Sequence, residues 1–496
     1  MFFYYKIVSG SAVITERLQE KYFEIFGQML IHIIRPIVCG LYTISNPILP
    51  VQYKIRDCHR KIISIIGHNY KRNRRFARNI TKNLNVYQTV LEEELKKNGN
   101  QVDDWIFSLK NRKVLDDIFY FIENNLQEII DMPFSEILKS FLRYVKEQKK
   151  ILCKLWDQKV EYPEELVKKF PDLLEYAGYS KAIYGSSKKK ELWRDDKKKI
   201  GQKEKNMREF IEFTKVAKEN IIYNLGASSM YLPVNAVVLS HEKKSILIVI
   251  RGTKSLFDCA TDIDSQYTEI TICGITGKVH SGILKSSESV SKNIRDKVLE
   301  YLSTNPGYGI IITGHSLGAG CGSLLTLLWL NDTEMNKYPI KCFAYAPPSV
   351  LSTNLNYLLK GIVLSCVNGD DMIPRLSYGS LVDFNNMILY IYKQDLNQEF
   401  DDFYEKFRGE CKMEKIYPPG DVMQIFHKSE AQYSNFCIGK GFNENSKIVF
   451  VPGFVSNDFY GTILFSKTML KNHKMDRYIE GLNDIMQKLW NGHGFS

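Results

Sequence analysis

One run of residues, from Ile310 to Gly320, restricts the possible folds of this 496-residue chain more than any other. It reads Ile-Ile-Ile-Thr-Gly-His-Ser-Leu-Gly-Ala-Gly, an apolar run typical of a buried strand followed by small residues that suit the start of a helix. The pattern Gly-x-Ser-x-Gly places Ser316 on a sharp turn between strand and helix, with its hydroxyl exposed above a parallel sheet. The motif occurs once in the chain and predicts a serine nucleophile.

Other short apolar runs surround this motif and indicate the fold class. From about residue 170 onward, such runs alternate with segments of helical spacing. Short continuous apolar runs separated by helices are typical of a mostly parallel sheet covered on both faces. We therefore predict an α/β fold, with strands at 236–239, 245–250, 310–313, 341–346 and 361–367, the first two forming a pair.

Charge and cysteine usage limit the partners and the compartment. The chain carries 67 Lys and Arg against 56 Asp and Glu, a net charge of +11. This modest excess favours contact with anionic surfaces such as phospholipid, although a solvated basic face gives the same count. The sequence has no zinc-type cysteine spacing, phosphate-binding glycine loop or RNA-binding signature, so we expect no nucleic-acid partner and no metal. The ten cysteines are scattered without a compact disulfide pattern, which indicates a reducing compartment.

Residues 1–165 differ from the rest of the chain, and we predict a mainly helical N-terminal region there. Within it, residues 25–53 are strongly apolar but are interrupted by Arg35 and Pro36. A membrane-spanning helix needs about 20 predominantly apolar residues and tolerates a central arginine poorly, so this segment could span, lie on or avoid a membrane. A basic cluster at 68–78 follows, and it suits either an anionic membrane surface or a solvated helix face. No pattern of a secretory signal peptide is present at the N-terminus.

Residues 166–496 are predicted to form the α/β domain. A lysine-rich stretch at about 186–209 is too charged to pack, and we predict it to be an inserted loop.

A serine hydroxyl is a weak nucleophile, so Ser316 needs a histidine base and a carboxylate that orients this histidine. With this turn, the order along the chain is serine, acid, histidine. Asp370 and Asp371 follow the apolar run 361–367, which is where the acid is expected. The pattern alone does not separate these two aspartates.

Three histidines lie beyond the aspartates. His473 lies in a polar loop between an apolar stretch and a terminal helical pattern, where a base is expected. His427 ends an apolar run and fits an ordinary half-buried residue, and His493 lies close to the end of the chain. These positions favour His473 as the base.

The oxyanion formed during acyl transfer needs hydrogen-bond donors. The backbone N–H of Leu317, directly after the serine, is the first candidate. Thr253 follows the predicted strand at 245–250 and offers a backbone N–H and a hydroxyl as the second.

Together these motifs resemble the class 3 lipases, and more narrowly the sn-1-specific diacylglycerol lipases. The similarity covers most of residues 170–490. Besides the serine motif, it is carried by several segments: Leu173–Tyr179, His241–Thr253, Asp258 and Asp262, Val279–Gly282, Cys342–Pro348, Asp371–Arg375, Tyr417–Gly420 and Met469–His473. The resemblance selects Asp371 over Asp370 as the acid and also assigns His473 as the base.

The resemblance implies an α/β-hydrolase fold and hydrolysis of fatty-acyl esters of glycerolipids. Diacylglycerol cleaved at sn-1 is the expected substrate, giving a monoacylglycerol and a free fatty acid. A triacylglycerol lipase, a phospholipase A1 and a catalytically silent lipase-fold protein are the alternatives. The resemblance further implies association with a membrane or lipid-droplet surface and a catalytic domain in the cytoplasm. It implies that the chemistry needs no cofactor, and it implies an effect of calcium.

Two features depart from this family. Diacylglycerol lipases carry a multi-span membrane domain, whereas only residues 25–53 are a credible membrane segment here. The separation of Asp371 and His473 is also longer than in compact class 3 lipases. The additional residues, at about 376–450, resemble the insertion that diacylglycerol lipases carry near the active site.

Overall fold

The computed structural model describes residues 136–137, 139–145, 148, 164–185, 202–225, 231–253, 267–393, 414–429, 448–466 and 468–490. All of them belong to the second of two compact units, which extends from Asn100 to Ser496. The apolar segment 25–53 and the basic cluster 68–78 lie outside the described residues. Among the helices that the structure describes, none combines the length and apolarity needed to cross a bilayer.

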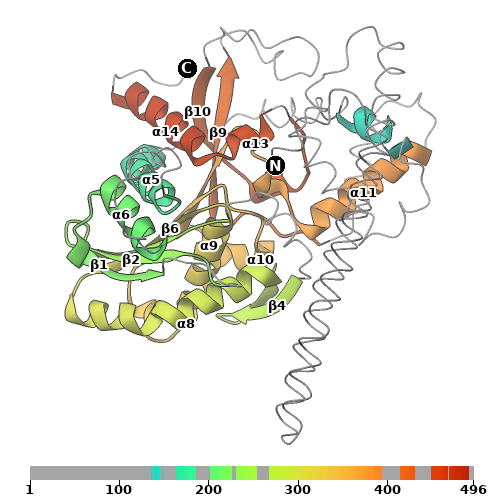
Figure 1. Ribbon diagram of the computed structural model, residues 1–496. Helices are drawn as coiled ribbons and strands as arrows, with labels where there is room; N and C mark the ends of the chain where they lie inside the picture. The colour runs from blue at the N-terminus through green and yellow to red at the C-terminus, as the bar shows by residue number, and fades with distance from the viewer. Residues whose placement is uncertain are drawn as a thin grey trace, which may run out of the picture. The chain divides into compact units, whose positions relative to one another are not determined.

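The centre of the unit is an eight-stranded sheet with the strand order β1-β2-β3-β6-β7-β8-β9-β10 (Figure 1). Neighbours from β3 to β9 are parallel, and the outer pairs β1–β2, β2–β3 and β9–β10 are antiparallel. These strands are β1 (Ile221–Leu225), β2 (Asn235–Ser240), β3 (Ser245–Ile250), β6 (Gly309–His315), β7 (Ile340–Tyr345), β8 (Val363–Asn368), β9 (Asp421–Ser429) and β10 (Ile448–Val455). The predicted α/β class is therefore confirmed.

The α-helices are α5 (Glu164–Ala182), α6 (Gln202–Thr214), α8 (Ser281–Thr304), α9 (Leu317–Leu330), α10 (Thr353–Asn356), α11 (Tyr378–Lys393), α13 (Met469–Asn472) and α14 (Met475–Trp490). A separate hairpin joins β4 (Tyr267–Ile272) to β5 (Ile275–His280). Short 3-10 helices occur at Lys218–Asn220, Met335–Lys337, Tyr357–Leu359, Ile373–Arg375 and Asn457–Tyr460.

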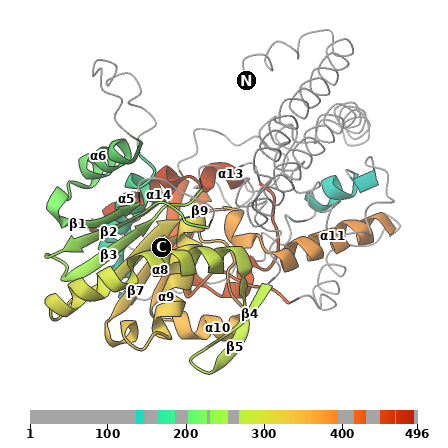
Figure 2. The same ribbon diagram turned by 60° about the horizontal axis from the view of Figure 1, so that its bottom comes forward.

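Side chains alternate between the two faces of the central strands, and each face has its own apolar core. On one face, Ile246, Ile248 and Ile250 pack with residues of α8 and α9. On the other face, Leu247 and Val249 pack with residues of α5 and α14. Figures 1 and 2 show these two helical layers on opposite sides of the sheet. Burial on both faces explains why the strands have continuous apolar sequences.

Two ranges that the sequence indicated as insertions contain regular structure. The C-terminal part of 186–209 belongs to helix α6, whose amphipathic sequence buries Phe210. The range 376–450 contains α11 and also β9, a strand parallel to β8 within the main sheet. Part of this range is therefore a strand of the main sheet, and β10 pairs with β9 as the next strand.

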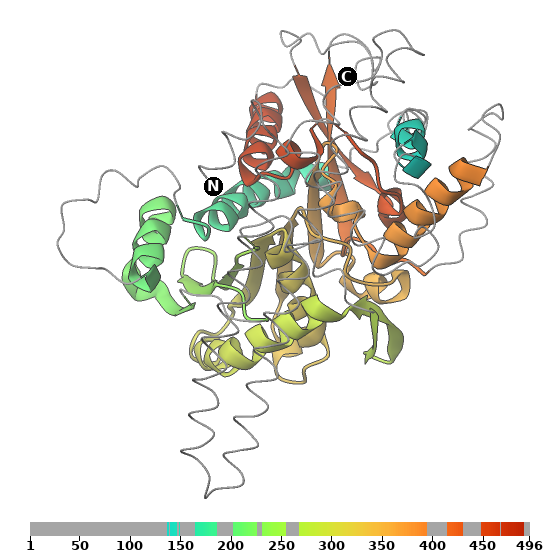
Figure 3. The ribbon, with the colours of Figure 1, turned by 45° about the vertical axis from the view of Figure 1, so that its right-hand side comes forward.

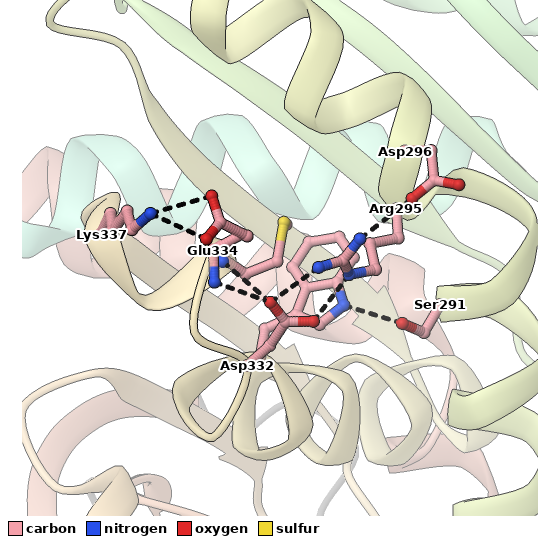
Figure 4. A network of polar contacts seen from close by, with 8 residues as sticks. Ser291, Arg295, Asp296, Asp332, Glu334 and Lys337 are labelled. Atoms are coloured by element: carbon pink, nitrogen blue, oxygen red, sulfur yellow. Dashed lines mark hydrogen bonds and ion pairs between the residues drawn. The ribbon is translucent and has the colours of Figure 1, made fainter.

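A bidentate ion pair fixes α8 against the C-terminal end of α9 (Figure 4). Arg295 Nε and Nη2 donate to the two carboxylate oxygens of Asp332 over 2.6 and 2.9 Å. Oδ1 of Asp332 also accepts the backbone N–H groups of Glu334 and Met335. The Arg295 guanidinium holds the pKa of Asp332 down at about 2. This network anchors the end of α9 that lies farthest from Ser316.

The helical residues 139–145 pack beside α11, as Figure 3 shows. Phe141 and Tyr144 make edge-to-face contacts with Phe384 of α11 and with Phe465. Tyr144 donates its hydroxyl proton to the carbonyl of Ile463 over 2.5 Å. The side chain of Gln148 bonds both the N–H and the C=O of Phe465. These contacts attach Phe141, Tyr144 and Gln148 to the segment that leads to His473.

Candidate active site

Ser316 lies between the last residue of β6 and the first residue of α9, in a strained backbone conformation. Its φ of 60° and ψ of −129° are rare for a residue with a side chain. The N–H of Ser316 donates to the carbonyl of Tyr345 over 2.9 Å, which holds the turn against β7. A Cβ on Gly318 would lie 2.2 Å from the carbonyl oxygen of Ile250, so only glycine allows α9 to start this close to β3.

His473 lies directly opposite this serine. It is the residue after α13 and precedes α14. Its Nε2 is 3.1 Å from Oγ of Ser316, and its Nδ1 is 3.0 and 2.9 Å from the two carboxylate oxygens of Asp371. The side chain of His473 is 5% exposed and that of Asp371 is 0% exposed. The arrangement suits a neutral ring with its proton on Nδ1, because Nε2 can then accept the serine proton.

Asp371 is oriented by further donors. It follows β8, and its Oδ1 accepts the N–H of Ile373 over 3.0 Å. Its Oδ2 accepts the hydroxyl proton of Tyr478 over 2.7 Å. Burial, and secondarily the charge of Asp371, raise the pKa of Tyr478, so this hydroxyl remains a donor. No local sequence signal indicates this contact between Tyr478 and Asp371.

The alternatives from the sequence lie elsewhere. Asp370 accepts hydrogen bonds from Thr468 and Asn472, whereas Asp371 is the carboxylate beside Nδ1 of His473. His427 is buried on β9, and its Nε2 donates to Oδ1 of Asn368 over 2.8 Å. Burial, together with the positive charge of Arg477, lowers the pKa of His427 to about 3. His493 lies outside the described residues. The structure thus brings together Ser316, Asp371 and His473.

His315, the residue before the serine in the Gly-x-Ser-x-Gly motif, contacts His473. Its Nε2 donates to the backbone carbonyl of His473 over 2.8 Å, and the two rings are 4.7 Å apart. The hydroxyl of Tyr184 lies 3.1 Å from Nδ1 of His315. Burial, and then the nearby His473, lower the pKa of His315 well below its ordinary value, so the ring stays neutral. No sequence pattern predicts this contact, because it joins a side chain to the backbone of a residue 158 positions further along the chain.

Leu317 directly follows Ser316, and Gly252, the residue before Thr253, lies against the serine. Leu317 is the first residue of α9, and the first N–H groups of a helix have no acceptor within that helix. A Cβ on Gly252 would lie 2.4 Å from the carbonyl oxygen of His315 and 3.2 Å from Cβ of Ser316. The loop that contains Gly252 and Thr253 therefore lies directly against the serine, on the positive end of the α9 dipole.

Within the described ranges, no group of three or more His, Cys, Asp or Glu side chains is arranged to hold a metal ion. Hydroxyl, imidazole and carboxylate form a complete set for acyl transfer through a serine.

Comparisons with known proteins show what this chain is similar to. Human diacylglycerol lipase-alpha is 24% identical over 309 residues, which is 54% of this chain and 29% of that protein. Mouse diacylglycerol lipase-beta is 34% identical over 161 residues, 31% of this chain and 23% of that protein. A lipase from Rhizopus niveus is 33% identical over 164 residues, 31% of this chain and 41% of that protein. The chain thus spans less than a third of the length of these diacylglycerol lipases.

Among solved structures, the Rhizomucor miehei lipase propeptide complex aligns with 64% of this chain and 81% of its own, at 18% identity and a TM-score of 0.39. Residues 247–380 match the family model described as Lipase (class 3). The matched range contains Ser316 and Asp371 and ends before His473. The chain carries a class 3 lipase domain, and its curated relatives include diacylglycerol lipases.

Proposed function

We propose that this protein is a serine lipase that hydrolyses fatty-acyl esters of glycerolipids. Diacylglycerol is the first-choice substrate, cleaved at sn-1 to a monoacylglycerol and a free fatty acid. One observation carries the proposal: the His473 ring lies between Ser316 and Asp371 at hydrogen-bond distance from both. The substrate class rests on the diacylglycerol lipases among the relatives.

In the proposed reaction, Oγ of Ser316 attacks the ester carbonyl while Nε2 of His473 takes the hydroxyl proton. Asp371 keeps the Nδ1 proton of the ring in place and stabilises the imidazolium that forms. The N–H of Leu317, with the N–H or hydroxyl of Thr253, stabilises the negative charge on the carbonyl oxygen. His473 then gives its proton to the departing glycerol oxygen, which leaves Ser316 acylated.

The second half of the reaction releases the fatty acid. A water molecule attacks the acyl carbonyl as His473 takes one of its protons, and the same two donors hold the oxyanion again. Collapse of this intermediate returns the proton to Oγ of Ser316. The chemistry needs no cofactor; an effect of calcium is carried over from the family resemblance alone.

The proposal extends to the organisation of the whole chain. Residues 166–496 form the lipase domain, and residues 1–165 form a mainly helical region whose apolar segment 25–53 and basic cluster associate with a membrane or lipid-droplet surface. The catalytic domain then faces the cytoplasm, which agrees with the scattered cysteines; within the described residues, Cys321, Cys342 and Cys366 are buried free thiols.

A panel of diacylglycerol, triacylglycerol and phosphatidylcholine, each with distinct acyl chains at sn-1 and sn-2, tests the proposal on the purified protein. We expect the fastest release from sn-1 of diacylglycerol and no release by a Ser316→Ala variant. Faster cleavage of triacylglycerol or of phospholipid would favour those alternatives. Absence of turnover, together with absence of labelling by a fluorophosphonate, would identify a silent lipase-fold protein.

A further inference from the structure

The helix before His473 is held at both ends by one side chain that the proposed chemistry does not use. Asp370 is buried, and its Oδ2 accepts the hydroxyl proton of Thr468 over 2.7 Å. Its Oδ1 accepts a proton from Nδ2 of Asn472. Thr468 is the N-cap of α13 and Asn472 is its last residue. The carboxylate of Asp370 therefore contacts both ends of α13.

A second set of contacts holds the same end of the helix. The carbonyl of Asn472 accepts Nδ2 of Asn368 over 3.3 Å, and Oδ1 of Asn368 accepts Nε2 of His427 over 2.8 Å. Gly369 makes room for these groups, since a Cβ on it would lie 2.7 Å from Nδ2 of Asn472 and 2.8 Å from Cε1 of His427. The φ of Gly369 is 56°, which also favours glycine.

Such support is needed because α13 has only four residues, and helices this short are not stable on their own. His473 follows directly, so any rotation of α13 moves the ring relative to Ser316. A displacement of about 1 Å in a reacting group can cost about 100-fold in rate. Burial of the Asp370 carboxylate without hydrogen-bond donors would destabilise the fold. Burial also raises the pKa of this carboxyl to about 6. The two donors offset part of this cost.

We infer that Asp370 is a positioning residue of the active site: through Thr468 and Asn472 it fixes α13 so that His473 reaches Ser316. The neighbouring carboxylates thus have different tasks, Asp371 holding the imidazole and Asp370 holding the helix that carries it. This inference rests on the proposed role of Ser316 and His473.

Two substitutions at this position separate the hydrogen bonds from the charge. In Asp370→Asn, the amide oxygen still accepts from Asn472, and the amide NH2 donates to Thr468, whose hydroxyl can also accept. Asp370→Ala removes both bonds. Asp332→Asn serves as the matched control, because it weakens a carboxylate hydrogen-bond network at the far end of α9, where the Asp332 side chain is 22% exposed.

The measurements are the rate constant for labelling of Ser316 by a fluorophosphonate, and kcat and KM for a soluble short-chain ester. Each variant of the full chain is assayed well below its own Tm. We expect Asp370→Ala to lower the labelling rate and kcat by about 10- to 100-fold with little change in KM. Asp370→Asn should stay within about threefold of the wild type in both. Asp332→Asn should lower Tm but label at the wild-type rate.

Wild-type labelling of Asp370→Ala would overturn the inference. Equal losses in Asp370→Asn and Asp370→Ala would also overturn it, because the charge of the carboxylate and not its hydrogen bonds would then matter. An equal loss in Asp332→Asn would overturn it as well, because the effect would then not be specific to α13. If the wild type labels but cleaves no glycerolipid, the proposed substrate class fails while the labelling series still decides the role of Asp370. If the wild type does not label, both the activated serine and this inference fail.

Discussion

Tyr478 donates its hydroxyl proton to Oδ2 of Asp371 over 2.7 Å. The same oxygen lies 2.9 Å from Nδ1 of His473, so the tyrosine and the imidazole share one acceptor. Tyr478 belongs to α14, which also packs against α5 across one face of the sheet. The orientation of the carboxylate therefore depends on the packing of the C-terminal helix.

Removal of this hydroxyl by Tyr478→Phe should lower kcat by about 5- to 20-fold, because Asp371 loses a donor and gains rotational freedom. KM should change little, since the ring still fills the core. Steady-state kinetics on a soluble ester measure both quantities. Tyr308→Phe is the control, because this hydroxyl lies 2.8 Å from Nδ1 of the exposed His241, at the opposite end of β6 from Ser316. Unchanged kcat in Tyr478→Phe would show that the other donors orient Asp371 alone.

The loop before Thr253 has no room for a side chain at Gly252. Gly252→Ala should lower kcat by about 100-fold, because its methyl group must displace the backbone of His315 or the loop that carries Thr253. Gly274→Ala is the matched control: both are loop glycines, but no atom lies within 4 Å of a Cβ built on Gly274. Gly274 has a φ of +78°, so this control is expected to cost about 1 kcal/mol of stability without loss of kcat. Normal turnover by Gly252→Ala would exclude this loop from the oxyanion site.

Buried neutral histidines make the fold sensitive to acid. Burial lowers the pKa of His280 to about 4 and of His427 to about 3 from the ordinary 6.5, and it lowers that of His315 as well. The unfolded chain therefore binds more protons below pH 6.5, so the free energy of unfolding falls as pH falls. His280 and His427 each cost about 2 kcal/mol of stability at pH 5 relative to pH 7. Burial raises the pKa of Asp370 to about 6, so the folded state binds more protons at this carboxyl than the unfolded chain does. This adds about 1 kcal/mol to the free energy of unfolding between pH 7 and pH 5.

Urea unfolding at pH 7 and pH 5 measures this difference. His280→Asn provides a sharp test, because His280 accepts the N–H of Ile283 as the N-cap of α8, and asparagine fills that position well. We expect the loss of stability between pH 7 and pH 5 to shrink by about 2 kcal/mol in this variant. An unchanged loss would mean that His280 does not carry the proton uptake.

The helical residues 139–145 and Gln148 are expected to stabilise the unit that contains the sheet. Gln148→Ala should destabilise the protein by about 2 to 3 kcal/mol, because it leaves the buried N–H and C=O of Phe465 without their side-chain partner. Lys139→Ala, at a partly exposed position of the same segment, should change stability by less than about 0.5 kcal/mol. Chemical denaturation of the full chain measures both. Equal effects would show that this segment contributes no specific contact.

The fold class could be predicted because its signals are local. Apolar runs of strand length and the small residues around Ser316 follow from burial and from close packing, and the parallel sheet confirms both. The range 376–450 was harder to interpret, because β9 pairs with β8 across a long connection and no local pattern marks its membership of the sheet.

The candidate site shows the same division between local and distant information. Asp370 and Asp371 are neighbours in one loop, so spacing could not separate them; their different partners come from α13 and α14, about a hundred residues further along the chain. The contacts of His315, Tyr478 and Thr468 likewise join distant segments. Their roles in catalysis, like those of Ser316, Asp371 and His473, stay predictions until they are measured.

Fluorophosphonate labelling of the wild type, followed by mass spectrometry of the modified peptide, tests the central claim most directly. Ser316→Ala and His473→Ala are the test variants, and Ser303→Ala and His241→Gln are exposed controls of the same residue types. We expect a single adduct on Ser316, none in Ser316→Ala, at least about a 1000-fold slower reaction in His473→Ala, and normal labelling of both controls. An adduct on another residue, or full-rate labelling of His473→Ala, would contradict the central claim.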